Sequence, residues 1–349
     1  MDRVSSAQPG PDVQTLPVHT VSVVVPVYQG ERTLDDLLAE IEPFHVEQTT
    51  AAGHRYVVTE VLLAYDNGPD GSAAVIRRLA EKSDKVRPVW LSRNFGQHAA
   101  TLAGMASSGG DWILTMDEDG QHDPAYLPDL LDTAMRERAG VVYARPTNAA
   151  PHGFLRNIAS KGAKRLVDVL GGGQDISTFQ SYRLVLGELG RSIAAYAGAG
   201  VYLDVALSWV NGRIAQCPIE LRQEGDRPSG YSTRTLLSHF WRLVLTSGTR
   251  GLRAVALLGA LFGVLGLAFA AYAVIGTLLG SIAAPGWAST VVLISLGTGA
   301  ILLSLGVIAE YLGSVVGMAM GRPLYLISHD PAEGPLGRQL PSSTPALDS

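Results

Sequence analysis

The sequence predicts an α/β protein in which an open parallel sheet, covered by helices, is joined to two membrane-spanning helices near the C-terminal end. Between about residues 21 and 116, apolar runs rich in β-branched residues alternate with stretches of helical periodicity, which is typical of doubly wound sheets. Between Arg253 and Glu310 there is no charged residue, and this run is long enough for two bilayer crossings.

Four strands are expected in the first part of the chain. The first begins at Val21 with VSVVVPV, a near-continuous run of the kind that is buried on both faces of a parallel sheet. The others are expected at 60–64, 86–91 and 112–116, with helical stretches between them. Ligands of such sheets bind beyond the carboxyl ends of the strands, so the polar residues there are expected to share one site. They are Tyr28, Asp66, Arg93 and Asp117.

The fourth strand runs into DEDGQ, the stretch with the clearest chemistry. Asp117 and Asp119 lie two apart at the end of a buried strand, where carboxylates are costly unless a cation meets them. Gly120 allows a tight turn. With Gln121 the two carboxylates form an all-oxygen set that suits Mg²⁺ or Mn²⁺. A solvated acidic turn is the alternative interpretation.

Composition narrows the class of protein. The net charge of −5 gives no dominant basic field, which argues against a nucleic-acid partner. Cys217 is the only cysteine, so a disulfide framework and a cysteine metal site are both excluded. The N-terminus lacks the basic-then-apolar pattern of a signal peptide, and the apolar run near the C-terminal end is therefore expected to be the anchor.

Four motifs follow one another along the first part of the chain: VPVYQG, YDNGPDGS, SRNFGQHAATLAGM and MDEDGQHDP. In this order and at this spacing they resemble those of the family 2 glycosyltransferases, which use nucleotide-diphospho-sugars and have the GT-A fold. The similarity runs from about Val21 to past Arg145. Each motif alone is weak, and the four together are strong. Gly30 and Tyr65 stand at positions where many members of this family carry an acidic residue. The two differences bear on which nucleotide base the donor site accepts.

The resemblance implies roles for the residues at the strand ends. The nucleoside would be held by Pro26, Tyr28 and Asp66. The diphosphate and its metal, Mg²⁺ or Mn²⁺, would be met by Asp117 on the nucleotide side and by Asp119 and Gln121 as metal ligands. The two aspartates are the predicted catalytic residues.

The acceptor is expected to bind between residues 141 and 222. Arg156 and Ser160 lie four apart, on one helical face, and resemble the arginine and serine that engage lipid phosphate in dolichol-phosphate mannose synthases. A cationic helix near the membrane is the alternative. The loop from Arg222 loosely resembles that of polyprenol-phosphate glycosyltransferases, with Gly230 in place of the usual lysine. The predicted ligands of the acceptor phosphate are Arg145, Arg156, Ser160, Arg222 and Arg227.

The C-terminal third is predicted to lie in and across the membrane. Apolar and basic residues alternate from Thr235 to Arg253, as in a helix that lies in the interface. Spans are expected at about 254–279 and 288–309. Arginines flank their outer ends and the turn between them has none, so both termini are expected in the cytoplasm. The motifs EYLG and GRPLY resemble the end of bactoprenol glucosyltransferases.

The chain therefore divides into five predicted parts. They are a disordered N-terminus at 1–20, a GT-A domain at 21–234, a juxtamembrane amphipathic helix at 235–253, two transmembrane helices at 254–316 and a cytoplasmic tail at 317–349. A multi-pass protein of the cytoplasmic membrane is expected, with its catalytic domain on the cytoplasmic side and membrane lipid as a partner. The sequence does not decide whether the protein forms a homo-oligomer.

The resemblance implies transfer of a monosaccharide from a nucleotide-diphosphate sugar to an undecaprenyl- or decaprenyl-type phosphate. Metal-assisted displacement would invert the anomeric centre and supply a lipid-linked sugar for cell-envelope glycans. A processive polysaccharide synthase is an alternative, but the Gln-x-x-Arg-Trp acceptor motif of that class is absent and more spans would be needed. A non-enzymatic membrane scaffold that kept the fold is a second alternative.

Overall fold

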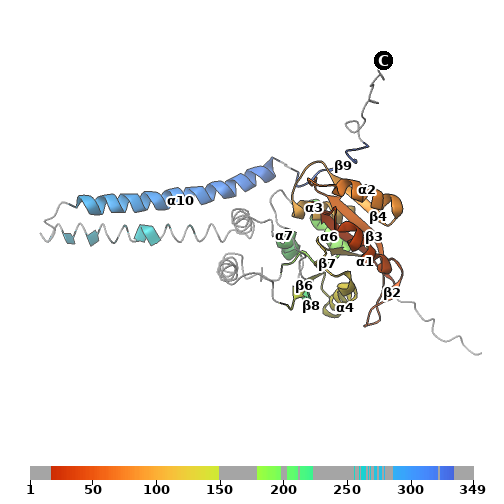
Figure 1. The fold of residues 1–349 in the computed structure, drawn as a ribbon. Helices are drawn as coiled ribbons and strands as arrows, with labels where there is room; N and C mark the ends of the chain where they lie inside the picture. Colours follow the sequence, from red (N-terminus) through yellow and green to blue (C-terminus); the bar gives the residue numbers. More distant parts are fainter. Residues whose placement is uncertain are drawn as a thin grey trace, which may run out of the picture.

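The computed structural model describes residues 17–148, 179–197, 203–210, 213–222, 286–320 and 323–333, together with scattered residues between 255 and 279. Within them lies one nine-stranded sheet of order β8-β6-β7-β5-β1-β3-β4-β9, with β2 paired to β3 (Figure 1). The strands are β1 (His19–Val27), β2 (Gln48–Thr49), β3 (Arg55–Tyr65), β4 (Val86–Leu91), β5 (Trp112–Thr115), β6 (Val141–Pro146), β7 (Arg183–Leu186), β8 (Ile214–Ile219) and β9 (Ile327–Ser328).

The four predicted strands are present as β1, β3, β4 and β5, and they pair in parallel. The expected open parallel sheet is present in these four strands, but the complete sheet is mixed, because β2 pairs with β3 in antiparallel fashion and two later strands are antiparallel as well. β7 runs antiparallel to both β5 and β6, and β9 runs antiparallel to β4. The direction of a short strand is set by the partner it pairs with, and neither four-residue β7 nor two-residue β9 carries that information in its own sequence. The result is a mixed α/β sheet.

Helices cover both faces of the sheet. β1 shows why: Val21, Val23 and Val25 point into one apolar cluster and Val24 into the other, all at most 1% exposed. Burying each such side chain stabilises the fold by about 1.5–3 kcal/mol. The described helices are α1 (Leu34–Ile41), η1 (Glu42–His45), α2 (Ser72–Lys82), α3 (Gln97–Ser107), η2 (Pro124–Tyr126), α4 (Leu127–Glu137), α6 (Gly187–Tyr196), α7 (Leu203–Val210) and α10 (Trp287–Ala319).

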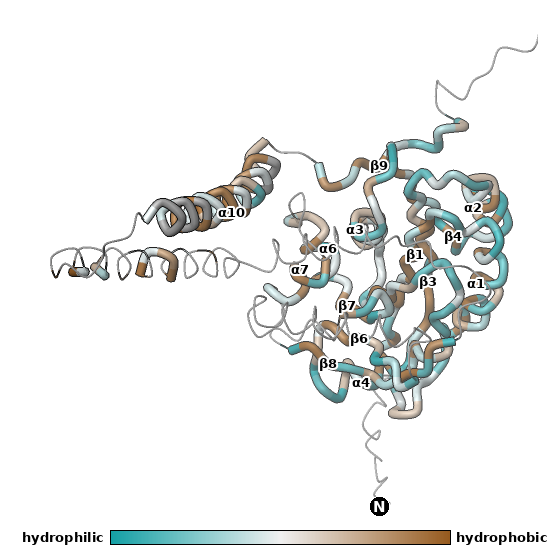
Figure 2. The backbone as a smooth tube through the Cα atoms, turned by 60° about the vertical axis from the view of Figure 1, so that its left-hand side comes forward, coloured by the Kyte–Doolittle hydropathy of each residue, from teal (hydrophilic) through white to brown (hydrophobic). Residues whose placement is uncertain are grey.

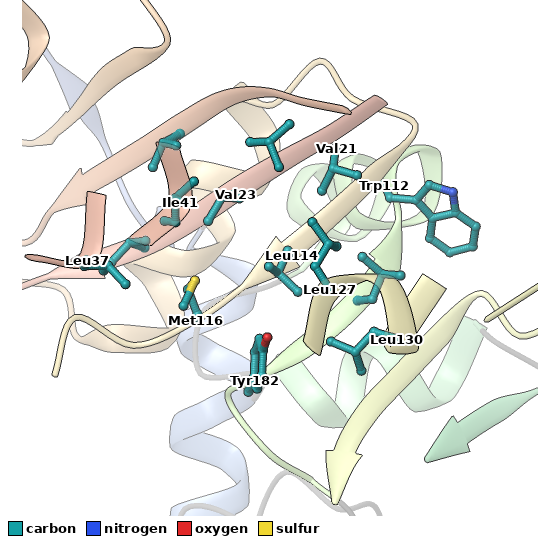
Figure 3. Close-up of a cluster of buried hydrophobic side chains, with 14 of the residues drawn as sticks. Val21, Val23, Leu37, Ile41, Trp112, Leu114, Met116, Leu127, Leu130 and Tyr182 are labelled. Carbon is teal, nitrogen blue, oxygen red and sulfur yellow. The ribbon is translucent and has the colours of Figure 1, made fainter. Parts of the chain in front are cut away.

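One core layer lies beneath α1, α2 and α4, and the other beneath α3, α6 and α7. In the first, Leu37 and Ile41 of α1 and Leu127 and Leu130 at the start of α4 face the sheet (Figure 3). Met116, directly before the acidic turn, is fully buried in the same layer. The end of β5 is therefore fixed by packing, which holds the following carboxylates at a defined place.

The helix α10 extends away from the sheet domain and is coloured as apolar over much of its length (Figures 1 and 2). Among the described residues it is the one helix long and apolar enough to cross a membrane, with a mean hydropathy of 1.5 over Leu296–Gly313 and none of that window buried. It contains the second predicted span but continues to Ala319 instead of ending at residue 309. Half of the residues of the first predicted span, 254–279, lie outside the described part.

The segment predicted as a tail from residue 317 onward is partly described by the structure. Residues up to 319 still belong to α10, and the segment 323–333 comes back to the sheet, where it contributes β9. A two-residue strand carries no periodicity that could be recognised in the sequence. Residues 334–349 lie outside the described part of the chain.

Candidate functional site

The strand ends predicted to share a site do lie at one edge of the sheet. Parallel register sets Val27 opposite Tyr65, and Tyr65 opposite Trp90, while Val24 is opposite Thr115. The loops that follow β1, β3, β4 and β5 therefore begin at neighbouring positions. Pro26 is buried within β1 itself, and the side chain of Tyr28 just beyond it is 42% exposed.

Glu118, the middle residue of DEDGQ, holds the loop after β1. Its carboxylate accepts hydrogen bonds from the backbone N–H groups of Tyr28 and Gln29, both at 2.9 Å. A charged acceptor with two backbone donors is a strong arrangement. Sequence reasoning missed Glu118, because an acidic residue that faces another loop's backbone looks like any other member of an acidic turn.

The loops after β1 and β3 are tied to each other. Gly30 N–H donates to Ser72 Oγ at 2.8 Å, and Gly71 N–H donates to Glu31 Oε2 at 3.0 Å. At Gly68 an added Cβ would lie 1.5 Å from the carbonyl oxygen of Tyr28, so no larger residue fits there. The predicted nucleoside loops thus form one cross-linked unit.

Asp66 orders the loop after β4. Its carboxylate, in a residue only 3% exposed, accepts hydrogen bonds from Phe95 N–H at 2.7 Å and Gly96 N–H at 2.8 Å. Burial raises the pKa of Asp66, while these two donors and the Arg93 guanidinium act to lower it. Gly96 has a φ of 95°, which favours glycine at the start of α3. The residue predicted to bind nucleoside therefore also shapes the neighbouring loop.

Asp117 is held from two sides. Gln97 Nε2, at the start of α3, donates to Asp117 Oδ1 at 2.6 Å, and Ser181 Oγ donates to Oδ2 at 2.6 Å. Its own N–H donates to His122 Nδ1 at 2.9 Å. Burial lowers the pKa of His122, which favours the neutral ring required for Nδ1 to accept. Gln97 and Ser181 were not predicted as site residues, since their partner is distant in sequence.

Asp119 and Gln121 lie on the same tight turn. Gln121 N–H donates to Asp119 Oδ1 at 3.0 Å, and Gly120 between them has a φ of 77°. Among the described residues there is no group of three or more His, Cys, Asp or Glu side chains that could hold a metal ion. The oxygen donors on this turn fit a magnesium-like ion that takes most of its ligands from a bound diphosphate, as such ions commonly do.

A cavity of about 170 Å³ lies beside Asp117. Its lining includes Arg183 and Asp204, which form a buried ion pair, 2% and 7% exposed. Tyr143 Oη donates to Asp204 at 2.9 Å, and Arg183 Nε donates to Thr115 Oγ1 at 3.1 Å. Burial lowers the pKa of Arg183, which nevertheless stays charged next to its carboxylate partner. The full lining is Gln97, His98, Thr101, Asp117, Phe179, Gln180, Ser181, Arg183 and Asp204.

Two of the five predicted ligands of the acceptor phosphate, Arg145 and Arg222, lie in the part of the chain that the structure describes. Arg145 is exposed at the end of β6, opposite Pro218 of β8. Arg222 lies against the acidic turn, where its N–H donates to Gln121 O at 3.2 Å. Its guanidinium pairs with Glu40 at 2.7 Å and with Asp123 at 2.8 Å. Arg156, Ser160 and Arg227 lie outside the described residues.

The chain is similar in sequence to known proteins. The family described as glycosyl transferase family 2 matches residues 22–181. An undecaprenyl-phosphate 4-deoxy-4-formamido-L-arabinose transferase of Klebsiella pneumoniae (strain 342) is 28% identical over 328 residues, covering 89% of this chain and 93% of the relative. The protein of the same name from Pseudomonas aeruginosa (strain LESB58) is 27% identical over 342 residues, covering 95% and 94%.

Among solved structures, glucosyl-3-phosphoglycerate synthase of M. tuberculosis is similar with a TM-score of 0.46 and 19% identity, covering 66% of this chain and 80% of that chain. The family match includes β1, β3, β4, β5 and the acidic turn, and so contains the cross-linked loops described above. The resemblance inferred from the four motifs is confirmed. Residues 22–181 of the chain form a glycosyl transferase family 2 domain.

Proposed function

We propose that this protein transfers a monosaccharide from a nucleotide-diphosphate sugar to a polyprenyl phosphate in the cytoplasmic membrane. The observation that carries the proposal is a set of contacts around DEDGQ: Glu118 holds the loop after β1, and Gln97 and Ser181 hold Asp117. Both relatives named above are undecaprenyl-phosphate transferases, and they align with about nine-tenths or more of this chain.

The donor is proposed to lie across the cross-linked loops. Pro26, Tyr28 and Asp66 would hold the nucleoside, and Asp117 would face the nucleotide side of the diphosphate. The exposed ring of Tyr28 is free to cover a base. The loops are held by backbone donors on fixed carboxylates, so they would be ordered before the donor arrives, which reduces the entropy lost on binding.

Asp119 and Gln121 would hold Mg²⁺ or Mn²⁺ together with the diphosphate. When bound, such an ion neutralises the charge that develops on the departing nucleoside diphosphate. The protein's own contribution is to fix the turn: Met116 is buried, Gly120 makes the bend, and His122 is buried beneath Asp117. A preorganised turn costs little reorganisation during the reaction.

The acceptor phosphate would be met by Arg145, Arg156, Ser160, Arg222 and Arg227. Cations at that place offset the repulsion between an anionic acceptor and an anionic donor. A lipid phosphate is already anionic at neutral pH, so it can attack without a strong general base. A single displacement by that oxygen inverts the anomeric centre. Arg222 would have to exchange one of its carboxylate partners, Glu40 or Asp123, for the phosphate.

The membrane arrangement is part of the proposal. We place two spans, at about 254–279 and within α10, with the amphipathic segment 235–253 in the interface and both termini in the cytoplasm. The support is the apolar, exposed window of α10 and the arginines that flank the uncharged run. The catalytic domain, 21–234, then faces the cytoplasmic leaflet, where it meets the phosphate of a lipid whose tail cannot leave the bilayer.

The test uses membranes that contain the full-length protein. They are incubated with a panel of labelled nucleotide sugars, including one that carries 4-deoxy-4-formamido-L-arabinose, and with a short-chain polyprenyl phosphate. We expect one labelled sugar to pass into a lipid product that releases a monosaccharide on mild acid hydrolysis. A labelled polymer would indicate a processive synthase. No transfer from any donor, with the protein folded, would favour the scaffold alternative.

A further inference from the structure

The segment that follows α10, residues 323–330, runs along the β4 edge of the sheet and is called the strap below. We propose that the strap positions the loop Ser92–Gln97 of the donor site, and that Arg77 and Asp330 are the positioning pair that anchors it. The inference rests on the proposed role of Asp66 and Asp117 in donor binding, and it gives the C-terminal segment a part in that site.

Main-chain pairing brings the strap directly to the start of this loop. In β9, Ile327 lies opposite Leu91 and Ser328 opposite Trp90 of β4. Ser92 N–H, the first of the loop, donates to Leu326 O at 2.9 Å. β4 would be the last strand of the sheet without β9. The strap therefore fixes the direction in which the chain leaves β4.

The far end of the strap is anchored by an ion pair. Arg77 of α2 donates to Asp330 through Nε at 2.5 Å and through a terminal nitrogen at 2.6 Å. Asp330 is 7% exposed and also accepts from Ala332 N–H at 2.8 Å. The Arg77 guanidinium lies over the ring of Trp90, 5.2 Å from its centroid. Bidentate pairing of a largely buried carboxylate fixes both side chains in one geometry.

The near end of the strap is held by apolar packing. Leu324 and Tyr325 pack against the core layer that contains Leu91 and Ala194. Tyr325 Oη also donates to Ala194 O at 3.3 Å. The strap is thus attached at both ends, to α6 on one side and to α2 on the other, and its middle lies on β4.

The loop that begins beside the strap contacts two predicted donor ligands. Phe95 and Gly96 donate their N–H groups to Asp66, and Gln97 donates to Asp117. Because Ser92 lies only a few residues before Phe95, Gly96 and Gln97, a shift of the backbone at Ser92 would also move the N–H groups that bind Asp66 and Asp117. Since the strap follows α10 after a short connection, the donor site is joined through it to the proposed membrane helix.

The experiment compares neighbouring arginines on α2 in the full-length protein in membranes. Arg77→Gln removes the strap anchor. The matched control is Arg78→Gln, because Arg78 pairs with Asp35 of α1 instead. Apparent KM values for donor and acceptor, kcat, and hydrogen exchange of the peptide 91–97 are measured for each. The charge-reversed double variant Arg77→Asp/Asp330→Arg tests for rescue.

We expect Arg77→Gln and Asp330→Asn each to raise the donor KM about fivefold, which is less than the full value of a charged hydrogen-bonded pair because this pair acts on the donor only through the loop. Exchange in 91–97 should become faster, acceptor KM should stay within twofold, and the double variant should recover most of the change. Equal rises in both KM values, or an unchanged donor KM, would overturn the inference. If the wild-type protein transfers no sugar, the proposed function is wrong. The inference about the strap is tested separately by hydrogen exchange, and unchanged exchange of the peptide 91–97 in Arg77→Gln would overturn it.

Discussion

Ser181 Oγ donates a 2.6 Å hydrogen bond to Asp117 Oδ2, although the two residues lie 64 positions apart in the chain. Together with Gln97 on the other oxygen, Ser181 fixes the plane of the carboxylate at the end of β5. We expect Ser181→Ala to lower kcat/KM about tenfold, as loss of one hydrogen bond to a charged group implies. Ser181→Thr keeps the hydroxyl and should retain most activity, and steady-state transfer assays distinguish the two.

Glu118 is expected to matter through the backbone it holds. Glu118→Ala removes both acceptors of the Tyr28 and Gln29 N–H groups, so the loop after β1 should lose its fixed position. The donor KM should rise roughly tenfold to hundredfold, which corresponds to the loss of about 1.5–3 kcal/mol in total, the value of one hydrogen bond to a charged group, because water can replace part of the two bonds. Glu118→Gln, with one acceptor oxygen, should give an intermediate value. Equal activity in all three proteins would show that the loop is ordered by other contacts.

A divalent cation is expected to be essential. Asp119→Asn should lower turnover by roughly two orders of magnitude or more, because a preorganised charge partner is lost from the departing diphosphate. The exposed Asp84→Asn, distant in sequence from the acidic turn, serves as the control. Excess chelator should abolish transfer, and Mg²⁺ or Mn²⁺ should restore it. Full activity in chelator would exclude the metal role of Asp119 and Gln121.

The acceptor prediction concerns Arg156. Arg156→Ala should raise the apparent KM for polyprenyl phosphate much more than that for the nucleotide sugar, because a cation beside an anionic acceptor is lost. Kinetics with each substrate varied in turn would measure the difference. Equal weakening of both substrates would indicate a folding defect. If neither KM changes, Arg156 does not bind the acceptor phosphate, and the acceptor site would then be expected around Arg222 and Arg227.

The orientation of the proposed spans can be measured by thiol labelling. A cysteine at Ser281, in a Cys217→Ser background, should react with an impermeant reagent added to intact cells, since the uncharged turn is proposed to lie outside. A cysteine at Ser5 should react only after lysis. Labelling of Ser281→Cys only after lysis would reverse the proposed topology.

Local patterns were sufficient to predict much of the molecule. β1, β3, β4 and β5 follow from runs of apolar and β-branched residues, and their shared edge follows from parallel pairing. The turn of Asp117, Asp119 and Gly120 follows from residue types alone. These features depend on residues that are close together in the sequence, and such local patterns can be recognised in a single sequence.

Contacts between distant segments could not be predicted in this way. Glu118 binds backbone amides about 90 residues earlier, and Arg183 finds its ion-pair partner Asp204 on another element. The antiparallel entry of β7 and the two-residue β9 leave no periodic signal, since a short strand is defined by its partner. Pairing specificity of this kind arises from tertiary packing, on which local propensity has little bearing.

The place of β9 in the chain has a consequence for how the protein is made. Translation runs from the N-terminus, so β1 to β8 leave the ribosome before α10, and β9 leaves after it. Until then the outer edge of β4 has unpaired N–H and C=O groups, an aggregation hazard for a nascent domain. The sheet can therefore be completed only after the apolar helix has been synthesised and has had the opportunity to enter the bilayer. A chain truncated before Ile327 would present that open edge permanently.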